Sequence, residues 1–370
     1  MTLRIAIIAP YDHTKIYGNT LRAKYLAEYL TAHNKVVDTY CFKPPTSSDR
    51  SHIRINKGLL SILPSWLRFR NLPFLFDFPF FQKVSINNNA DLVIVENYYT
   101  YLILPQKKNF KVIIDYHSLK SEEMDRRGLK FIFKPIVELI EKKGLHASDH
   151  IIVASENIKD LIQRKFEIDS SRISVVHNSV DPNEYLKNQY RDDFKVGIIG
   201  PFLDGENLAC IPHIEKLAAS IPEVVVLVGT LQPEHKRKLQ RHENIEILGE
   251  LTVTNYQKFF EKIGAIFLPY FNNSMGGGIR NKLLESAASG TPIISTLSGA
   301  RGFGTDNILI VESIEEASLA IEALKNSVEL RRKLGNNLLK SLHQNHSFKT
   351  EAHKISSLVS QLKLDQVENT

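Results

Sequence analysis

The chain has 370 residues, 43% hydrophobic and 24% charged, which predicts a soluble protein of two ordinary domains and excludes a disordered chain. Its two cysteines, Cys41 and Cys210, fall in different halves, and its 13 histidines show no metal-binding spacing, so we expect neither a disulfide framework nor a metal site. The net charge of +6 arises in the first half, because residues 1–190 contain 27 Lys and Arg against 20 Asp and Glu, whereas residues 191–370 contain 20 against 21.

The first elements predict an α/β domain. Residues 3–10 form an apolar run of strand length without a signal-peptide cleavage site, and no window offers the about 20 uncharged apolar residues that span a bilayer. We therefore expect a cytoplasmic protein. Residues 21–33 repeat apolar side chains at a helical period, and VVDTYCF at residues 36–42 is a second strand.

The next stretch is basic and aromatic. Residues 43–83 contain seven Lys and Arg against two Asp, interleaved with aromatic side chains. Such a pattern suits an anionic membrane surface or a lipid-linked substrate, and Trp66, Arg68 and Arg70 are its predicted contacts. A solvated basic face over the core is the alternative. Nucleic-acid binding is not expected, since no recognition motif accompanies the charge.

Strands and helices alternate through the rest of the chain. The first half continues with short apolar runs at 91–97, 111–118 and 150–156 and helices at about 130–147 and 156–166, and the second half has strand-like runs beginning near residues 195, 223, 245, 265 and 291. Uniformly apolar runs between helices predict two doubly wound parallel sheets, joined by a polar connection near residues 181–192. Two helices without strands are expected from 329 to 362. Ligands of such sheets bind beyond the carboxyl ends of the strands.

The most informative motif is GGGIRNKLLESAASG at residues 276–290. Three glycines precede a predicted helix that Gly290 ends, so free amides and the positive end of the helix dipole favour a pyrophosphate there. Arg280 would add a cation, and Glu285, about a turn deeper, is suited to bind the hydroxyls of a ribose. Glycines that merely permit close packing are the alternative interpretation.

This motif, continuing to TPIIST, resembles the donor-binding segment of glycosyltransferase family 4, in the variant form G-x-G-x-R-x-K-x-L-E. SGARGF at 298–303 looks like that variant's G-A-E-G-L loop, VVHNSVDPNEY at 175–185 is similar to the family's segment at the domain junction, and further similar segments lie at 148–156 and 245–270. The resemblance implies a GT-B fold: an acceptor-binding Rossmann-like domain at 1–184, a donor-binding Rossmann-like domain at 185–346, and a C-terminal helix at 347–370 that packs back toward the first domain.

The resemblance also implies an activity and site residues. It implies metal-independent transfer of a hexose-type sugar, with retention, from a nucleotide-diphosphate sugar to an acceptor hydroxyl on a polysaccharide, glycolipid or polyprenyl-linked glycan, with no other cofactor. His117 would orient or polarise groups near the transferred sugar, and Arg280 would stabilise the leaving diphosphate. The donor-binding residues that it implies are Gly18, Asn19, Gly200, Leu248, Gly249, Gly277, Gly278, Ile279, Arg280, Lys282 and Glu285.

Two departures from the family pattern keep other functions open. Gly277 stands where the usual pattern has a second glutamate that contacts the sugar, and GPFLDGENL at 200–208 has Asp204 and Glu206 where the family often has phosphate-binding cations. A sugar-nucleotide 2-epimerase on the same fold and a catalytically silent nucleotide-sugar-binding protein are the alternatives. A lone histidine such as His117 could also be purely structural.

Overall fold

The computed structural model describes residues 3–9, 18–33, 35–41, 52–54, 85–86, 89–96, 100–105, 109–123, 133–203, 205–271 and 277–368. The chain divides into two compact units. Unit 1 contains residues 1–177, 276–278 and 351–370, and unit 2 contains residues 178–275 and 279–350. The first boundary thus falls between His177 and Asn178, seven residues before the expected one, and the last helix is shared between the units.

Unit 1 contains a seven-stranded parallel sheet in the order β3-β2-β1-β4-β5-β6-β7. Its strands are β1 (Arg4–Ile8), β2 (Val36–Cys41), β3 (His52–Arg54), β4 (Leu92–Glu96), β5 (Lys111–Tyr116), β6 (His150–Val153) and β7 (Ile173–Val175). Its helices are α1 (Gly18–Ala32), α3 (Lys120–Glu123), α4 (Lys134–Ala147), α5 (Glu156–Phe166) and α13 (Phe348–Glu368), with a 3₁₀ turn, η2, at Thr100–Ile103 and another, η4, at Ser170–Arg172. Strand β3 lies inside the basic stretch and was not predicted, because three residues carry too little periodicity to be recognised.

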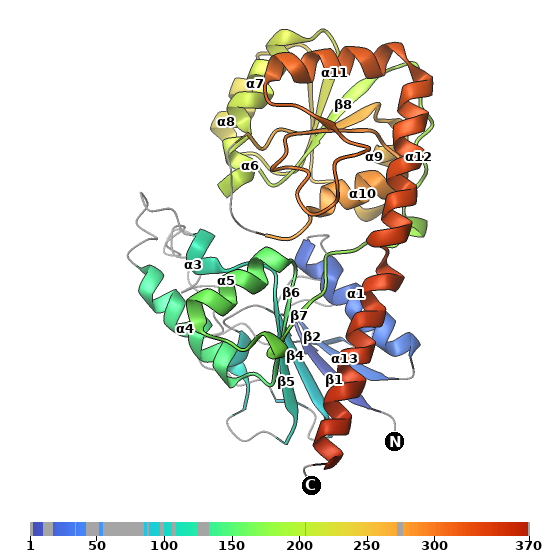
Figure 1. Ribbon diagram of the computed structural model, residues 1–370. Helices are drawn as coiled ribbons and strands as arrows, with labels where there is room; N and C mark the ends of the chain where they lie inside the picture. The colour runs from blue at the N-terminus through green and yellow to red at the C-terminus, as the bar shows by residue number, and fades with distance from the viewer. Residues whose placement is uncertain are drawn as a thin grey trace. The chain divides into compact units, whose positions relative to one another are not determined.

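Both faces of this sheet are covered, which explains why its strands are apolar throughout. One face packs against α4 and α5, where Val137, Leu145, Ile158 and Ile162 join the core. The opposite face packs against α1 and α13 (Figure 1). Ser155 begins α5 as its N-cap by accepting a hydrogen bond from the Ile158 amide, as short hydroxyl side chains commonly do.

The C-terminal helix belongs to the core of unit 1. Ile355 and Val359 of α13 are buried together with Ile5 and Ile7 of β1. The 3.6-residue period of the helix brings its apolar side chains to one face, and that face covers the sheet. The end of the chain therefore stabilises the domain that its beginning forms.

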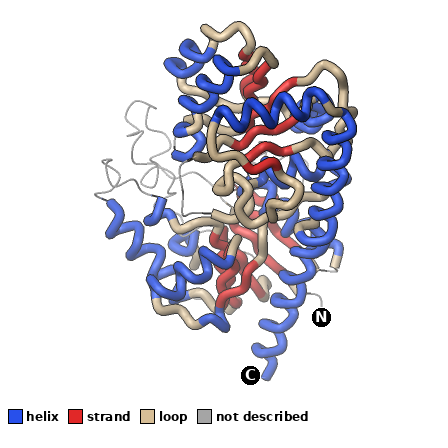
Figure 2. Tube along the Cα trace, turned by 45° about the horizontal axis from the view of Figure 1, so that its top comes forward, coloured by secondary structure: helices blue, strands red, loops and turns tan. Residues whose placement is uncertain are grey.

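Unit 2 contains a six-stranded parallel sheet in the order β10-β9-β8-β11-β12-β13. Its strands are β8 (Lys195–Ile199), β9 (Val224–Val228), β10 (Ile245–Gly249), β11 (Ala265–Leu268), β12 (Ile293–Ser295) and β13 (Leu309–Ile310). Its helices are α6 (Gly205–Ala209), α7 (Ile211–Ser220), α8 (Pro233–Leu239), α9 (Val253–Lys262), α10 (Asn281–Ser289), α11 (Ile314–Asn326) and α12 (Val328–Asn345), with a 3₁₀ turn, η5, at Pro182–Glu184. Figure 2 shows the strands of each unit enclosed by helices.

Helix α10 is the element that carries the predicted donor motif. It ends at Gly290, which adopts a left-handed conformation with φ of 73°, where a side chain would be strained. A Cβ at Gly335 of α12 would lie 1.9 Å from the Gly290 carbonyl oxygen, so the two helices approach too closely for any larger residue there. Gly290 therefore has a packing role, and so has Gly278 before α10, where a Cβ would lie 2.7 Å from the Ala154 carbonyl oxygen.

The order of strands in each sheet reverses at one point. In unit 1 the sequence order reverses between β1 and β4, and in unit 2 between β8 and β11. At such a point neighbouring loops leave in opposite directions and open a crevice beyond the carboxyl ends of the strands. Each unit should therefore carry its functional residues at this place.

Candidate functional site

The two predicted basic residues lie at the carboxyl end of the unit 2 sheet, where Lys282 contacts the end of β8 and Arg280 contacts Tyr270, two residues after β11. Arg280 is the N-cap of α10, one residue before the helix begins, whereas the sequence placed it in the first turn. Its side chain makes no capping hydrogen bond, although its carbonyl accepts from the Leu283 amide at 3.0 Å, so no N-cap side chain occupies the first amides of α10. The N-terminus of α10 thus combines the positive end of a helix dipole with a guanidinium.

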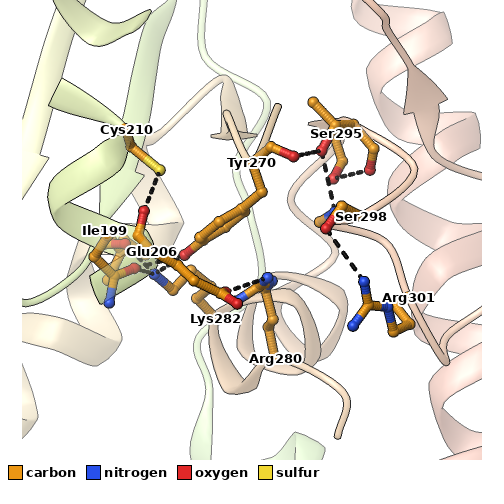
Figure 3. A network of polar contacts seen from close by, with 12 residues as sticks. Ile199, Glu206, Cys210, Tyr270, Arg280, Lys282, Ser295, Ser298 and Arg301 are labelled. Carbon is orange, nitrogen blue, oxygen red and sulfur yellow. Dashed lines mark hydrogen bonds and ion pairs between the residues drawn. The ribbon is translucent and has the colours of Figure 1, made fainter. Parts of the chain in front are cut away.

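Arg280 is held by an aromatic ring and a carboxylate (Figure 3). Its Cζ lies 3.6 Å from the centroid of the Tyr270 ring, and its Nη2 donates to Oε2 of Glu206 at 2.7 Å. Its Nε is buried without a hydrogen-bond partner among the described residues. The guanidinium is therefore fixed in orientation while one of its donors stays unused.

Lys282 has a different environment. Its ammonium group donates to the carbonyl of Ile199 at 2.5 Å, to Oδ1 of Asn207 at 3.0 Å and to the hydroxyl of Tyr270 at 2.6 Å (Figure 3). A Cβ added at Gly200 would lie 3.1 Å from this ammonium. The three hydrogens of Lys282 are thus engaged in joining α10 to the end of β8.

Glu285 is the buried carboxylate of the site, with 3% of its surface exposed. Its two oxygens accept from the hydroxyl of Tyr256 at 2.5 Å and from that of Tyr185 at 3.4 Å. Burial raises the pKa of Glu285 above its usual range, although the Tyr256 hydrogen bond and the charge of Lys282 oppose this shift. Each oxygen keeps a second lone pair, so two hydroxyls of a ligand can bind without displacing the tyrosines.

The remaining predicted donor residues occupy separate parts of the fold. Gly249 ends β10 with φ of 70°, beside the exposed Leu248. Gly277, with φ of 94°, and Gly278 group with unit 1, where the hydroxyl of Ser155 donates to the Gly277 carbonyl at 3.4 Å. Ile279 is buried.

Among the remaining predicted residues, the structure describes only the helical position of two and does not describe three others. Gly18 and Asn19 are the first residues of α1, the helix that follows β1. Trp66, Arg68 and Arg70 lie outside the described residues. The predicted surface of the basic stretch therefore stays a prediction.

His117 lies directly after β5, at the carboxyl end of the unit 1 sheet. Its Nε2 lies 2.6 Å from Oε2 of Glu96, the last residue of β4, and 3.8 Å from Oδ2 of Asp115. Arg22 of α1 donates from Nε and Nη2 to the two oxygens of Asp115, at 2.7 and 2.8 Å. His117 is thus part of a buried network of charged groups and not an isolated strand-end histidine.

Several residues of these two sites were not identified from the sequence. Glu96 and Asp115 end apolar strands, and a carboxylate at the carboxyl end of a parallel strand is a recognisable signal. Tyr256, Tyr270 and Arg22 carried no such signal, because ordinary helix and strand patterns account for them. Neither cysteine forms a disulfide and both are buried, and burial raises the pKa of the Cys210 thiol to about 11, which disfavours its reactive thiolate form.

Two doubly wound units in one chain, each with polar residues at its switch point, are typical of the GT-B fold, which is common among sugar-transferring enzymes. A family model described as Glycosyltransferase Family 4 matches residues 19–184, and one described as Glycosyl transferases group 1 matches residues 197–326. The chain belongs to the group 1 glycosyltransferases of family 4, and the expected family and fold class are confirmed.

Individual proteins show the same relationship. O-antigen chain mannosyltransferase RfbU of Salmonella typhimurium is 22% identical over 208 residues, which cover 54% of this chain and 57% of that protein. Among solved structures, sucrose-phosphate synthase from Thermosynechococcus elongatus has a TM-score of 0.78 at 18% identity, covering 98% of this chain and all of that one. HepE of Anabaena in complex with UDP has a TM-score of 0.68 at 11% identity, covering 97% of this chain and all of that one.

Proposed function

We propose that this protein transfers a hexose-type sugar from a nucleotide-diphosphate sugar to an acceptor hydroxyl, with retention at the anomeric carbon. The observation that carries the proposal is the arrangement of α10, whose open N-terminus bears the guanidinium of Arg280 while Glu285 lies buried along the same helix. A diphosphate needs positive potential and amide donors, and the adjoining ribose needs a hydroxyl acceptor. One helix at the switch point of unit 2 supplies all three.

The proposed chemistry is stabilisation of a leaving diphosphate. As the bond from the anomeric carbon to the phosphate oxygen breaks, negative charge develops on that oxygen, and fixed donors lower the barrier because they need no reorganisation. Arg280 and the first amides of α10 are those donors, and Arg280 is already held in position by Tyr270. In this proposal the nucleotide sugar is a co-substrate, and neither a metal nor another cofactor is required.

The roles of Lys282 and Glu206 refine the proposal. The ammonium of Lys282 donates to three acceptors, so it positions the loop after β8. It contributes to the donor site mainly through the electrostatic effect of its positive charge and not through direct contact. Glu206 lies beside Arg280 and opposes the binding of an anion. Arg280 and the backbone amides therefore provide most of the stabilisation of the phosphate charge.

The relatives support a nucleotide-sugar donor. The structure of HepE holds UDP, and RfbU is a mannosyltransferase of O-antigen chains. We extend this to a glycan or lipid-linked acceptor here, and the basic and aromatic composition of residues 43–83 favours an acceptor at the cytoplasmic face of a membrane. Among the described residues, none of the helices is both long and apolar enough to span a bilayer.

The acceptor proposal has its own test. The double charge reversal Arg68→Glu with Arg70→Glu should reduce association with vesicles of anionic lipid at low salt, because each basic residue near such a surface contributes about 1 kcal/mol. Reversal of two basic residues of unit 2, Lys236 and Arg237 of α8, is the matched control. Equal vesicle binding by the wild type, the Arg68 and Arg70 variant and the control would show that the basic stretch does not bind membranes.

The donor proposal is tested with Glu285→Ala and a panel of nucleoside diphosphates and their sugars. Calorimetry should show that the wild-type chain binds one nucleotide and that Glu285→Ala weakens this binding about 100-fold or more, since a buried polar group loses its partner. Glu246→Ala, which removes an exposed carboxylate of unit 2 paired with Lys195, is the control and should bind like the wild type. Unchanged affinity in Glu285→Ala would contradict the proposed site.

Turnover then separates the proposed activity from its alternatives. Transfer to an acceptor extract, with the configuration of the product read by NMR, is the expected result. Hydrolysis or epimerisation of the donor in the absence of any acceptor would instead indicate a sugar-nucleotide 2-epimerase. Binding without turnover would indicate a silent nucleotide-sugar-binding protein.

A further inference from the structure

Unit 1 holds a cluster of buried charged groups at the carboxyl end of its sheet. Glu96 comes from β4, Asp115 and His117 from β5, and Arg22 from α1, so three neighbouring elements converge on it. Glu96 and Asp115 are both completely buried, and the side chain of His117 is 12% exposed. Groups of this kind are costly to bury and are kept where each has a partner.

The cluster divides into two pairs. Arg22 binds both oxygens of Asp115 and also donates to the Val176 carbonyl at 2.8 Å, so its charge and that of Asp115 compensate each other. Glu96 is left to His117, at 2.6 Å. A further charged group, Glu351 of α13, acts electrostatically on Arg22.

Glu96 is poorly satisfied apart from His117. Its Oε1 is buried without a hydrogen-bond partner among the described residues. Burial raises the pKa of Glu96, and the charge of Asp115 raises it further. The interactions with His117 and Arg22 act in the opposite direction but do not cancel this rise. A carboxylate placed only for stability would gain more from full hydrogen bonding or from replacement by an apolar side chain. The position therefore serves the histidine at a cost in stability.

A metal centre is the competing interpretation of the same residues. One ligand atom each from Glu96, Asp115 and His117 lies within 4.8 Å of the others. Both oxygens of Asp115, however, accept hydrogen bonds from the guanidinium of Arg22, and a cation bound there would face that positive charge. The geometry therefore favours a hydrogen bond between Glu96 and His117 over a bound cation.

We propose that Glu96 is a positioning residue for His117: it binds Nε2 and so presents Nδ1 of the imidazole, as a hydrogen-bond acceptor, to a hydroxyl of the sugar or of the acceptor. Nδ1 makes no hydrogen bond with any described residue, and a carboxylate oxygen that accepts from Nε2 selects the tautomer that carries its hydrogen on Nε2. The same logic operates where a carboxylate orients a catalytic histidine. The catalytic consequence rests on the proposed function, whereas the choice of tautomer does not.

The tautomer is tested first, on the full chain and without any substrate. Long-range proton–nitrogen NMR spectra of the histidine-labelled protein, with the His117 signals assigned by difference from His117→Gln, should show the Nε2–H form in the wild type. Glu96→Gln should release this preference and populate the Nδ1–H form. An identical tautomer distribution in the two proteins would overturn the proposal.

Kinetics on the best donor and acceptor test the consequence. Glu96→Gln should lower kcat about 10- to 100-fold with little change in KM, because the loss of a partner that orients a functional histidine costs a factor of that order. In a double-mutant cycle with His117→Ala, Glu96→Gln should cause no further loss, since its effect passes through the imidazole. Additive losses would show that Glu96 acts independently of His117 and would overturn the proposal.

A matched control is Glu141→Gln in the same unit. Glu141 of α4 is also completely buried, accepts hydrogen bonds from Ser121 and makes no contact with His117, so its substitution should leave kcat unchanged. If Glu96→Gln does not fold, Glu96→Met, which fills the volume without an acceptor, replaces it in both experiments. Stoichiometric binding of Zn²⁺ by the wild type, lost in Glu96→Gln, would favour the metal centre and overturn the proposal.

These outcomes are separable from failure of the donor site. If Glu285→Ala binds nucleotides normally and no turnover is found, the proposed function fails, yet the NMR experiment still decides whether Glu96 selects the tautomer of His117. If nucleotide binding and transfer behave as proposed while the tautomer is unaffected, only the role of Glu96 fails. Each result thus rejects one statement.

Discussion

The guanidinium of Arg280 donates to the carboxylate of Glu206 at 2.7 Å, and this contact places an acidic group beside the one cation that the proposed donor site relies on most. Glu206 belongs to the short helix after β8, in a loop where the family pattern often has basic residues. An incoming diphosphate must share Arg280 with this carboxylate or displace it. The pair therefore sets a limit on donor affinity.

Substitution Glu206→Gln should strengthen nucleoside-diphosphate binding. Removing a negative charge a few ångströms from the phosphates, in a partly exposed site, should lower Kd about 3- to 10-fold. Isothermal titration with UDP at low and high salt measures the effect, which should shrink as salt screens the charge. Glu246→Gln, which breaks the exposed pair with Lys195, is the control, and an equal gain in that variant would show a general effect of net charge.

Substitution Lys282→Met should destabilise unit 2. It removes the donor to the Ile199 carbonyl and the Tyr270 hydroxyl, and leaving such acceptors without a partner costs about 1–3 kcal/mol, whereas Asn207 keeps its hydrogen bond from Tyr270. Chemical denaturation measures this loss, with the exposed Lys262→Met as the control. A variant as stable as the wild type that binds UDP far more weakly would instead assign Lys282 to direct phosphate binding.

Substitution Arg22→Met should strongly destabilise unit 1. It leaves the completely buried Asp115 without its bidentate partner, and breaking one side of a buried ion pair costs about 3–5 kcal/mol. The double variant Arg22→Met with Asp115→Asn should recover part of that loss, because the uncompensated charge is gone. Denaturation curves that show equal loss in the single and double variants would contradict a charge-based origin.

The stability of unit 1 should depend on Glu141 as pH changes. Burial raises the pKa of Glu141 from an ordinary 4.5 to about 7, so between these values the folded chain holds a proton that the unfolded chain releases. The contribution of Glu141 is therefore most favourable below about pH 4.5 and is lost as the pH rises to about 7. Relative to the wild type, Glu141→Gln should gain roughly 3 kcal/mol across this window, as measured by urea denaturation at each pH. A constant difference between the two proteins would refute the assignment.

Much of the fold follows from local patterns. Apolar runs of strand length between amphipathic helices predicted two parallel sheets, and the structure has β4, β5 and β9 at such runs. The glycine that ends α10 was recognisable because a left-handed cap admits few other residues. Short strands such as β3 and β13 were missed, since two or three residues show no period.

The sequence by itself determined most of the strands and helices, the family and the chain segment that bears Arg280 and Glu285, because periodicity, caps and motif spacing are properties of neighbouring residues. Only the tertiary structure decided that Glu96 binds His117, that Glu206 faces Arg280 and that Lys282 is held by three acceptors. Those partners are separated by 21, 74 and up to 83 positions in the chain. Their proximity results from the order of strands in each sheet, which brings the carboxyl ends of distant strands to one edge.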